Sequence, residues 1–333
     1  MGLKRVTKKF LKYLLIVLAG GSLIAIPFAD SSFHKGGTRG AFGKERIRCV
    51  ICPGDSDKLA KGYPTGYNYE LLKGFAQSRG SRADIFLSED ASRYVDSLRL
   101  DSLDILVVPE GTVTDKDGIA ESDPVDSSMV WLVKAGQSRA RDVNRWMATF
   151  RKSENFIPTR DRFFNGYNPY RKNRKKTGII SPYDGLLRVY SKVMGWDWKL
   201  FAAMIWQESR FRIQAKSGRG AAGLMQMMPG TAGRYDVENR IDPEESISAG
   251  ADYLARLQNL FREYAADKDE LTKFMLAAYN SGEGRIFSCI AEADSLGIGH
   301  AHWDSLKTVP GMSVETAGFV NAVLNQYEKF RAY

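Results

Sequence analysis

Apolar and polar positions follow two different periods along the first half of the chain. Short runs of alternating or continuous apolar residues, bounded by polar or glycine-containing stretches, are typical of strands, and spacings of three and four are typical of helices. The expected strands are 46–52, 83–87, 104–109 and 127–136, and the expected helices are 66–80, 91–99 and a segment around Val143, Trp146, Met147 and Phe150. Strands that alternate with helices predict a small α/β domain with a mainly parallel sheet over residues 46–155.

The second half of the chain has the helical period throughout. Apolar residues recur at three and four positions over 182–195, 197–211, 243–264, 269–280 and 313–330. Asp197, and either Asp242 or Ser246, are expected N-caps, whereas Gly195 and Gly282 are expected to end helices. The predicted fold class is therefore α+β multidomain, with a mainly α domain over residues 181–333.

The amino terminus has the pattern of an export segment, over residues 1–30. Five basic residues between Lys4 and Lys12 precede an uncharged run from Tyr13 to Ala29, and Asp30 begins a polar stretch. This order of charge and apolar residues directs export and keeps the basic flank in the cytoplasm. We expect a retained or slowly cleaved membrane anchor; a cleaved signal and a buried amphipathic helix are the alternatives. The expected location is the cell envelope, on the periplasmic side and associated with a membrane that the sequence does not specify.

The distribution of charge along the chain bears on whether it binds nucleic acid. The 333 residues have a net charge of +9, but residues 1–48 hold 10 basic and 2 acidic side chains and residues 139–176 hold 12 and 3. The remaining segments, 49–138 and 177–333, are net acidic at −6 and −2. A nucleic-acid-binding face on either domain is thereby disfavoured. Prolines, glycines and the run RKNRKK predict an exposed basic linker over 156–180.

One carboxylate lies on an apolar helical stripe. Glu208 follows Phe201, Met204 and Ile205 at seven, four and three residues. Burial there would raise the pKa of the carboxyl group and favour the protonated acid, which is the form that cleavage of a glycosidic bond requires. The alternative is a structural glutamate paired with Arg210 or Arg212.

Three motifs decide between these alternatives. The segments QESRF (207–211), AKSGRGAAGLMQMMPGTA (215–232) and AAYNSGEGRI (277–286) resemble, in order and spacing, the catalytic domain of the family-1 lytic transglycosylases. The resemblance covers residues 181–331. Within that family, the chain most resembles the membrane-bound F subgroup. The resemblance implies a lysozyme-like fold. Ala317 and Phe319 depart from the pattern, since the family usually has arginine and tyrosine there.

The resemblance also implies which residues form the site. Glu208 matches the sole catalytic acid and base, and Tyr279 is expected to hydrogen-bond or orient its carboxyl group. Ser217 and Gln226 are expected to hold the muramyl sugar. The other positions matching residues around the substrate are Asn280, which lines the sugar site, and Gly223, Leu224 and Met225, which supply close backbone approach and an apolar wall.

The activity implied by the resemblance is non-hydrolytic cleavage of peptidoglycan. The bond is the β-1,4 link between N-acetylmuramic acid and N-acetylglucosamine, and the product has a 1,6-anhydromuramyl end. No cofactor or metal is needed, and no second acid matches a catalytic position, in contrast to most glycosidases. The expected partners are glycan strands and a membrane, whereas contacts with other cell-wall enzymes are unknown. The alternatives are a hydrolytic muramidase and an inert peptidoglycan-binding or solute-sensing envelope protein.

The first domain resembles the family-3 extracellular solute-binding domain. The segment GYNYELLKGFA matches the first helix after strand one of that family. Too few residues separate 104–109 from 127–136 for the second lobe that normally closes on a ligand. We therefore expect a one-lobe domain used for placement or regulation, and assign it no ligand residues.

Two clusters with metal-like or redox-like spacing are expected to be structural. Cys49 and Cys52 lie three apart on a predicted strand and point to opposite faces, so buried free thiols are favoured, as for Cys289. The pair His300 and His302 has no cysteine or further histidine near in sequence, which disfavours a metal site.

Overall fold

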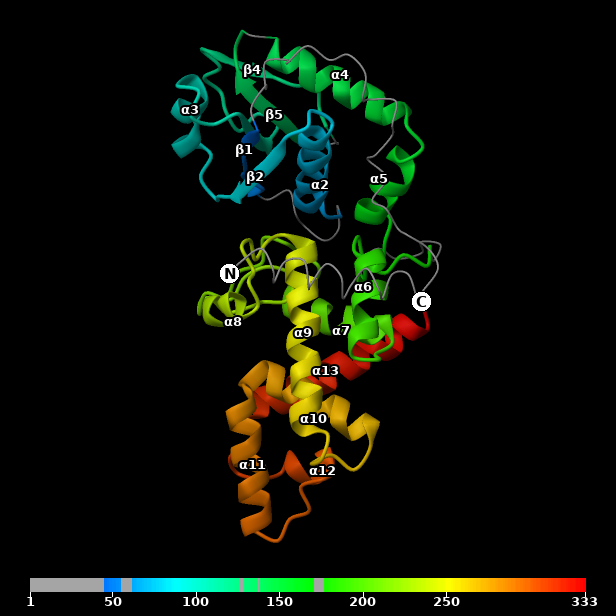
Figure 1. Cartoon of the computed structure of the whole chain (residues 1–333). Helices are drawn as coiled ribbons and strands as arrows, with labels where there is room; N and C mark the ends of the chain where they lie inside the picture. The colour runs from blue at the N-terminus through cyan, green and yellow to red at the C-terminus, as the bar shows by residue number, and fades with distance from the viewer. Residues whose placement is uncertain (1–44, 55–61, 126–127, 137, 171–176) are drawn as a thin grey trace. The chain divides into compact units, whose positions relative to one another are not determined.

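The computed structural model describes residues 45–54, 62–125, 128–136, 138–170 and 177–333 (Figure 1). The chain divides into two compact units, Met1–Pro182 and Tyr183–Tyr333. The expected export segment, 1–30, lies outside the described residues, and so does the basic run 171–176. None of the described helices is both long enough and apolar enough to span a bilayer.

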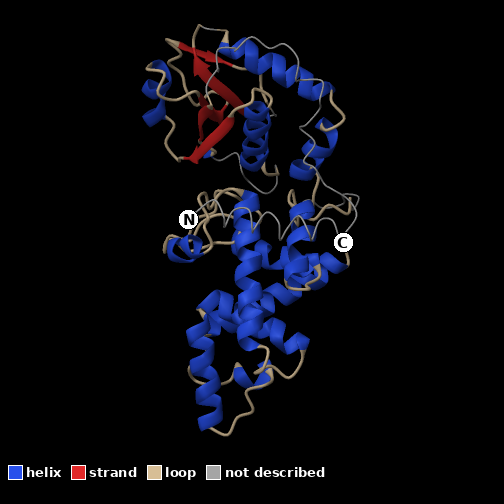
Figure 2. Ribbon diagram, viewed as in Figure 1, coloured by secondary structure: helices blue, strands red, loops and turns tan. Residues whose placement is uncertain are grey.

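The first unit is built on a five-stranded sheet of order β2-β1-β3-β5-β4. The strands are β1 (Arg46–Ile51), β2 (Arg82–Leu87), β3 (Ile105–Pro109), β4 (Ile119–Glu121) and β5 (Met129–Lys134). Helix α2 (Pro64–Gln77) joins β1 to β2, and α3 (Ser92–Arg99) joins β2 to β3. These two crossovers make β1 parallel to both β2 and β3. Every strand that the pattern predicted is present, and Figure 2 shows the described strands confined to this unit.

The expectation of a mainly parallel sheet is wrong, because the sheet is mixed. β5 pairs antiparallel with β3, and β4 pairs antiparallel with β5. A parallel return requires a crossover connection, usually a helix. The described part of the connection from β3 to β5 contains β4 but no helix, so β5 returns in the opposite direction.

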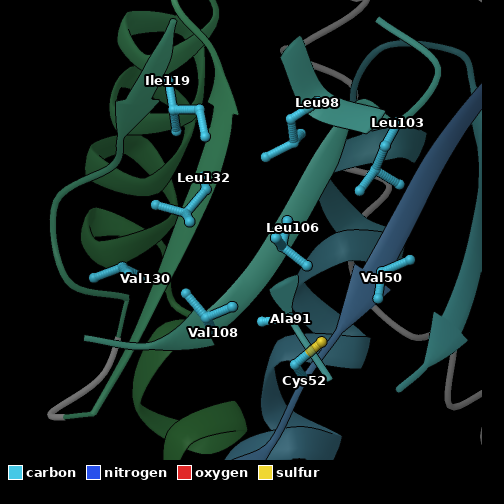
Figure 3. Packing of buried hydrophobic residues seen from close by; sticks show 10 residues of the cluster. All are labelled: Val50, Cys52, Ala91, Leu98, Leu103, Leu106, Val108, Ile119, Val130 and Leu132. Carbon is cyan, nitrogen blue, oxygen red and sulfur yellow. The ribbon is translucent and has the colours of Figure 1, made fainter. Parts of the chain in front are cut away.

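Each face of the sheet is covered by helices. On one face α3 closes a cluster to which β1, β3, β4 and β5 contribute (Figure 3); its members are Val50, Cys52, Ala91, Leu98, Leu103, Leu106, Val108, Ile119, Val130 and Leu132. On the other face, Trp131 of β5 packs against Phe75 of α2 and Trp146 of α4 (Arg139–Lys152). The indole N–H of Trp131 donates to Asn68 at 2.8 Å. The continuous apolar run of β5 is thereby buried on both faces.

The first part of the expected linker is folded. Residues Phe156–Phe164 form helix α5, and Phe163 is buried against Tyr67 of α2, with ring centroids 5.7 Å apart. The main-chain carbonyl of Phe163 also accepts a hydrogen bond from Tyr63 N–H just before α2. The basic composition of the segment predicted exposure. Burial of this phenylalanine against α2 outweighs the local charge, and composition alone does not reveal such a contact.

All three cysteines are free and buried, as expected. Cys49, Cys52 and Cys289 have exposed fractions of 0%, 3% and 1%. Burial raises the pKa of Cys52 to about 11 and raises the pKa of Cys49 well above its ordinary value. The thiols are therefore protonated and unreactive in the folded chain.

The second unit, which the structure describes completely, is helical. Its helices are α6 (Asp184–Tyr190), the short 3₁₀ helix η4 (Ser191–Val193), α7 (Trp198–Ser209), α8 (Pro229–Arg234), α9 (Pro243–Phe261), α10 (Lys268–Ser281), α11 (Glu283–Ser295), α12 (Trp303–Leu306) and α13 (Val314–Arg331). Helix α7 packs against α6 and α13, and α10 packs against α9, α11 and α13. Figure 1 shows this arrangement.

The ends of the long helices follow the expected caps. The carboxylate of Asp197 accepts the N–H of Lys199 at the start of α7, and Asp242 accepts those of Glu244 and Glu245 at the start of α9. Asp242 rather than Ser246 is therefore the cap of α9. Gly282, at φ +89°, ends α10 and precedes α11.

Candidate active site

Glu208 lies in the last turn of α7, a helix that is buried on nearly every side. Met204 and Ile205, one turn earlier on the same stripe, have no exposed surface. The helix ends immediately afterwards, because Arg210 and Phe211 both adopt positive φ (54° and 60°). The acid is thus held on a rigid element at the point where the chain leaves the helix.

Burial determines the protonation state of this acid. It raises the pKa of Glu208 from 4.5 to about 8, and no neighbouring charge contributes to the shift. Within the described residues, no hydrogen bond or ion pair engages the carboxyl group. Arg210 instead stacks over the ring of Trp206, and Arg212 donates to the carbonyl of Ser209. A structural ion pair therefore does not explain Glu208, which is a neutral, unengaged acid at pH 7.

The loop 215–227, here called the site loop, carries two of the expected sugar-binding residues. The hydroxyl of Ser217 accepts the N–H of Ala221 at 3.0 Å, which closes a tight turn. Gln226 adopts φ +47°, and its amide donates to the carbonyls of Ala215 and Gly223 at 3.0 and 2.9 Å. Both side chains thus hold the loop in shape. The Ser217 hydroxyl proton and the Gln226 carbonyl oxygen are used in neither of these bonds.

Gly223 allows another part of the backbone to approach the site loop. It adopts φ +77°, and a Cβ atom on it would lie 1.9 Å from the carbonyl oxygen of Arg240. The guanidinium of Arg240 returns to the same loop, where Nη1 donates to the carbonyls of Gly220 (2.7 Å) and Met227 (3.0 Å). One residue therefore clamps the loop through both its main chain and its side chain.

Leu224 and Met225 lie in the core of the unit. Both side chains have an exposed fraction of 0%. The side chain of Met225 lies so close to Gly250 of α9 that a Cβ atom there would be 2.5 Å from the methionine methyl group. Its main-chain N–H donates to the hydroxyl of Ser246 at 3.2 Å. These two residues anchor the loop, and their side chains form no exposed apolar wall.

Tyr279 of α10 joins the acid to the site loop. Its hydroxyl donates to the main-chain carbonyl of Met225 at 2.8 Å, in place of the expected bond to Glu208. Burial, followed by the charge of Glu208, raises the pKa of Tyr279 well above its ordinary value, so the phenol stays a donor. The tyrosine is therefore a near neighbour of the acid that leaves its carboxyl group open.

Asn280, the next residue on α10, contacts the last helix. Its side-chain oxygen accepts the hydroxyl of the buried Thr316 of α13 at 3.0 Å. The two departures from the family pattern, Ala317 and Phe319, lie on the same helix just after this contact. A hydrogen bond thus fixes α13 to the segment that carries Tyr279.

Sequence reasoning missed the residues that support the site. Arg240 clamps the site loop, Tyr253 packs on Tyr279 with ring centroids 5.3 Å apart, and Glu283 accepts the hydroxyl of Tyr253 at 2.9 Å. Arg240 carried no local signal, because its partners are main-chain carbonyls. Glu283 lies inside the AAYNSGEGRI motif, and that position was its one available signal.

The described residues contain no group of three or more side chains suited to hold a metal ion. The imidazole of His300 lies 2.5 Å from a carboxylate oxygen of Asp294. This contact assigns His300 a partner that its sequence neighbours did not suggest.

The part of the chain that carries this site is similar to a known protein family. The family model described as the transglycosylase SLT domain matches residues 186–300, which include Glu208, the site loop and Tyr279. This match confirms the resemblance that the three motifs indicated.

Curated relatives of the chain are membrane-bound lytic murein transglycosylases F. One from Desulfosudis oleivorans is 30% identical over 191 residues, which are 55% of this chain and 42% of that relative. Another, from Pseudomonas fluorescens, is 30% identical over 195 residues, 56% of this chain and 40% of that relative. The chain thus spans less than half the length of these relatives.

Solved structures with similarity to the chain are also lytic transglycosylases. An inactive variant of Slt from Pseudomonas aeruginosa has a TM-score of 0.38 and 27% identity, covering 48% of this chain and 26% of that one. The 70 kDa soluble lytic transglycosylase of Escherichia coli has a TM-score of 0.36 and 28% identity, covering 45% of this chain and 24% of that one.

Proposed function

We propose that the chain is a peptidoglycan lytic transglycosylase that cleaves the β-1,4 bond between N-acetylmuramic acid and N-acetylglucosamine. The observation that carries the proposal is the neutral, unengaged carboxyl group of Glu208 inside an SLT domain. A protonated acid at neutral pH can donate its proton to the glycosidic oxygen as that bond breaks. The relatives named as lytic murein transglycosylases support the same reaction class.

The proposed reaction uses one carboxyl group twice. Glu208 first protonates the leaving oxygen, and the C1–O bond breaks. Glu208, now a carboxylate, accepts the proton of the muramyl C6 hydroxyl while that oxygen bonds to C1, so the 1,6-anhydro ring forms and the acid is restored. Ser217 and Gln226 are proposed to hold the muramyl sugar during both steps, with Asn280 beside them.

Three acidic side chains that lie near the motifs in sequence are unsuited to the role of a second catalytic carboxylate. Glu283 is engaged by both Tyr253 and Arg256, and Asp236 and Glu238 are exposed. A retaining or inverting hydrolase uses a second carboxylate as nucleophile or as base for water. The internal C6 hydroxyl therefore fits the geometry better than water does, which favours a transglycosylase over a hydrolytic muramidase.

The product mass tests this function. Purified sacculi are digested with the full-length chain, and the muropeptides are analysed by mass spectrometry. We expect products about 18 Da lighter than hydrolytic ones, because the anhydro ring forms without adding water. Glu208→Gln should abolish them, whereas Glu328→Gln, at an exposed position on α13, should not. Reducing ends of ordinary mass would support a muramidase, and no products from the unchanged chain would support an inert binding protein.

The first unit is proposed to be a one-lobe solute-binding-like domain that places or regulates the enzyme. Its βαβαβ order from β1 to β3 supports this assignment. We also propose a lysozyme-like fold for the helical unit, and a periplasmic, membrane-associated location. The charge pattern of residues 1–30 and the membrane-bound relatives support that location. Fractionation of cells into membrane and soluble extracts tests it, with recovery in the soluble cytoplasmic extract as the contradicting result.

A further inference from the structure

Three side chains form a polar brace on α9 and α11, behind the tyrosine that neighbours Glu208. The hydroxyl of Tyr253 donates to one carboxylate oxygen of Glu283 at 2.9 Å. The other carboxylate oxygen accepts Nη1 of Arg256, also at 2.9 Å. Tyr253 and Arg256 belong to α9, and Glu283 is the first residue of α11. The Tyr253–Glu283–Arg256 brace therefore ties the middle of one helix to the start of another.

The charges of the brace keep its donors and acceptors fixed. Burial acts against ionisation of Glu283, but hydrogen bonds from its own N–H, from Tyr253 and from Arg256 lower its pKa below the ordinary value. Burial and the adjacent Glu283 raise the pKa of Tyr253. At neutral pH the carboxylate is thus a permanent acceptor and the phenol a permanent donor, and a hydrogen bond to an ionised group is stronger than a neutral one.

The brace reaches the site through packed aromatic rings. The Tyr253 ring lies against the Tyr279 ring at 5.3 Å and 41°, and Tyr235 lies on Tyr253 at 5.8 Å. Tyr279 is consequently held at two points, by its hydroxyl at the Met225 carbonyl and by its ring against Tyr253. Rotation of Tyr253 would remove the second support.

We propose that Tyr253 and Glu283 are positioning residues for the reaction of Glu208, acting through the ring of Tyr279. This inference rests on the proposed transglycosylase function. Glu283 orients Tyr253, the Tyr253 ring holds Tyr279 against the site loop, and Tyr279 shapes the surroundings of the acid. Small displacements of a catalytic group lower the rate of the chemical step, so the brace acts mainly on kcat. Ser217 and Gln226 are held by hydrogen bonds within the site loop and by the clamp of Arg240, so KM is largely preserved.

A double-mutant cycle on kcat tests the brace. The full-length chain and its variants Tyr253→Phe, Glu283→Ala and the double variant are assayed on soluble glycan fragments of alternating N-acetylglucosamine and N-acetylmuramic acid. Both single variants lack the hydrogen bond between Tyr253 and Glu283, and its loss should lower kcat about three- to tenfold. KM should stay within about twofold, since the sugar-binding loop is intact. Because both substitutions break the same bond, the double variant should be no slower than the slower single variant.

Two further variants separate positioning from a general effect on stability. Glu283→Gln keeps an acceptor for Tyr253 and should restore part of the kcat lost in Glu283→Ala. Glu328→Ala breaks an exposed ion pair with Arg331 at the end of α13 and should leave kcat unchanged. If Glu283→Ala does not fold, Tyr253→Phe and Glu283→Gln still provide the comparison.

Several outcomes would overturn the inference. They are unchanged kcat in Tyr253→Phe with a lowered melting temperature, single-variant losses that multiply in the double variant, and a rise in KM with constant kcat. Failure of the unchanged chain to form anhydro products would instead overturn the proposed function.

Discussion

The hydroxyl of Tyr279 donates to the main-chain carbonyl of Met225 across 2.8 Å, and so joins helix α10 to the site loop. The same tyrosine neighbours Glu208 without engaging its carboxyl group. A bond from the phenol to the acid would stabilise the carboxylate and lower its pKa. Because the phenol is committed to Met225, Glu208 keeps the proton that the proposed reaction needs.

Removal of this hydroxyl should affect both stability and rate. In Tyr279→Phe the carbonyl of Met225, a residue with no exposed surface, loses its side-chain donor. An unsatisfied buried acceptor costs about 1 to 3 kcal/mol of unfolding free energy. We expect a lower melting temperature and a lower kcat, measured by calorimetry and by release of anhydro products. Tyr264→Phe is the control, since Tyr264 is an exposed residue whose hydroxyl has no hydrogen bond within the described residues. Equal losses in both variants would contradict the role of the bond.

The pH dependence of the rate should follow the protonation of Glu208. The acid must be protonated to begin the reaction, and its pKa is raised to about 8. The value of kcat/KM should therefore be retained at neutral pH and decline as the pH rises through 8. A pH–rate profile on soluble glycan fragments measures this limb. A decline centred near pH 5 would show that the carboxyl group is not buried in the working enzyme.

The same titration should appear in stability. The folded-state pKa of Glu208 is above the ordinary value of 4.5, so the folded chain binds the proton more tightly than the unfolded chain does. The resulting stabilisation is present below pH 4.5 and is lost as the pH rises through 8. Glu208→Gln does not titrate.

The free energy of unfolding of Glu208→Gln should therefore increase relative to that of the parent chain as the pH is raised from 4.5 to 8. Denaturant unfolding at these two pH values measures the difference, and Glu328→Gln, an exposed position, should show little change. A constant difference between Glu208→Gln and the parent would argue against a buried neutral acid.

Two glycine substitutions should have opposite effects. Gly223→Ala places a methyl group on the carbonyl of Arg240 at a residue with φ +77°. Positive φ alone costs about 1 kcal/mol for alanine, and the clash must also displace the backbone. We expect a large loss of melting temperature and of activity. Gly233→Ala in α8 meets no atom within 4 Å and should be neutral or stabilising by up to about 1 kcal/mol. Similar melting temperatures for the two variants would contradict the close approach.

The sequence predicted elements well where one period persists. The strand of RIRCVIC, the helix of Glu208 and the caps Asp197 and Asp242 all follow from local spacing and capping chemistry. β4 was missed because three residues are too few to establish a period. The predicted direction of β5 was also wrong. It depends on whether a crossover helix connects β3 to β5, and the pattern of the strands alone does not show this. The fold of α5 depends on Phe163 meeting α2, a contact that composition does not reveal.

The acid of the site was predictable, but the partners of its neighbours were not. Glu208 shows on its own helix as a carboxylate among apolar residues. The bond of Tyr279 connects two segments far apart in the chain and ends on a backbone oxygen, which carries no residue-specific signal. The same holds for Arg240, whose two acceptors are backbone carbonyls. Site residues can thus be inferred from motifs, whereas the residues that support them are found only in the folded structure.

The three buried thiols can serve as native probes of local unfolding. Cys49 and Cys52 belong to the sheet-containing unit, and Cys289 belongs to the helical unit. A maleimide or iodoacetamide reacts with a thiolate that it can reach, so each thiol becomes reactive when its surroundings open. Peptide mapping after labelling would therefore report the opening of each unit separately, without an introduced probe.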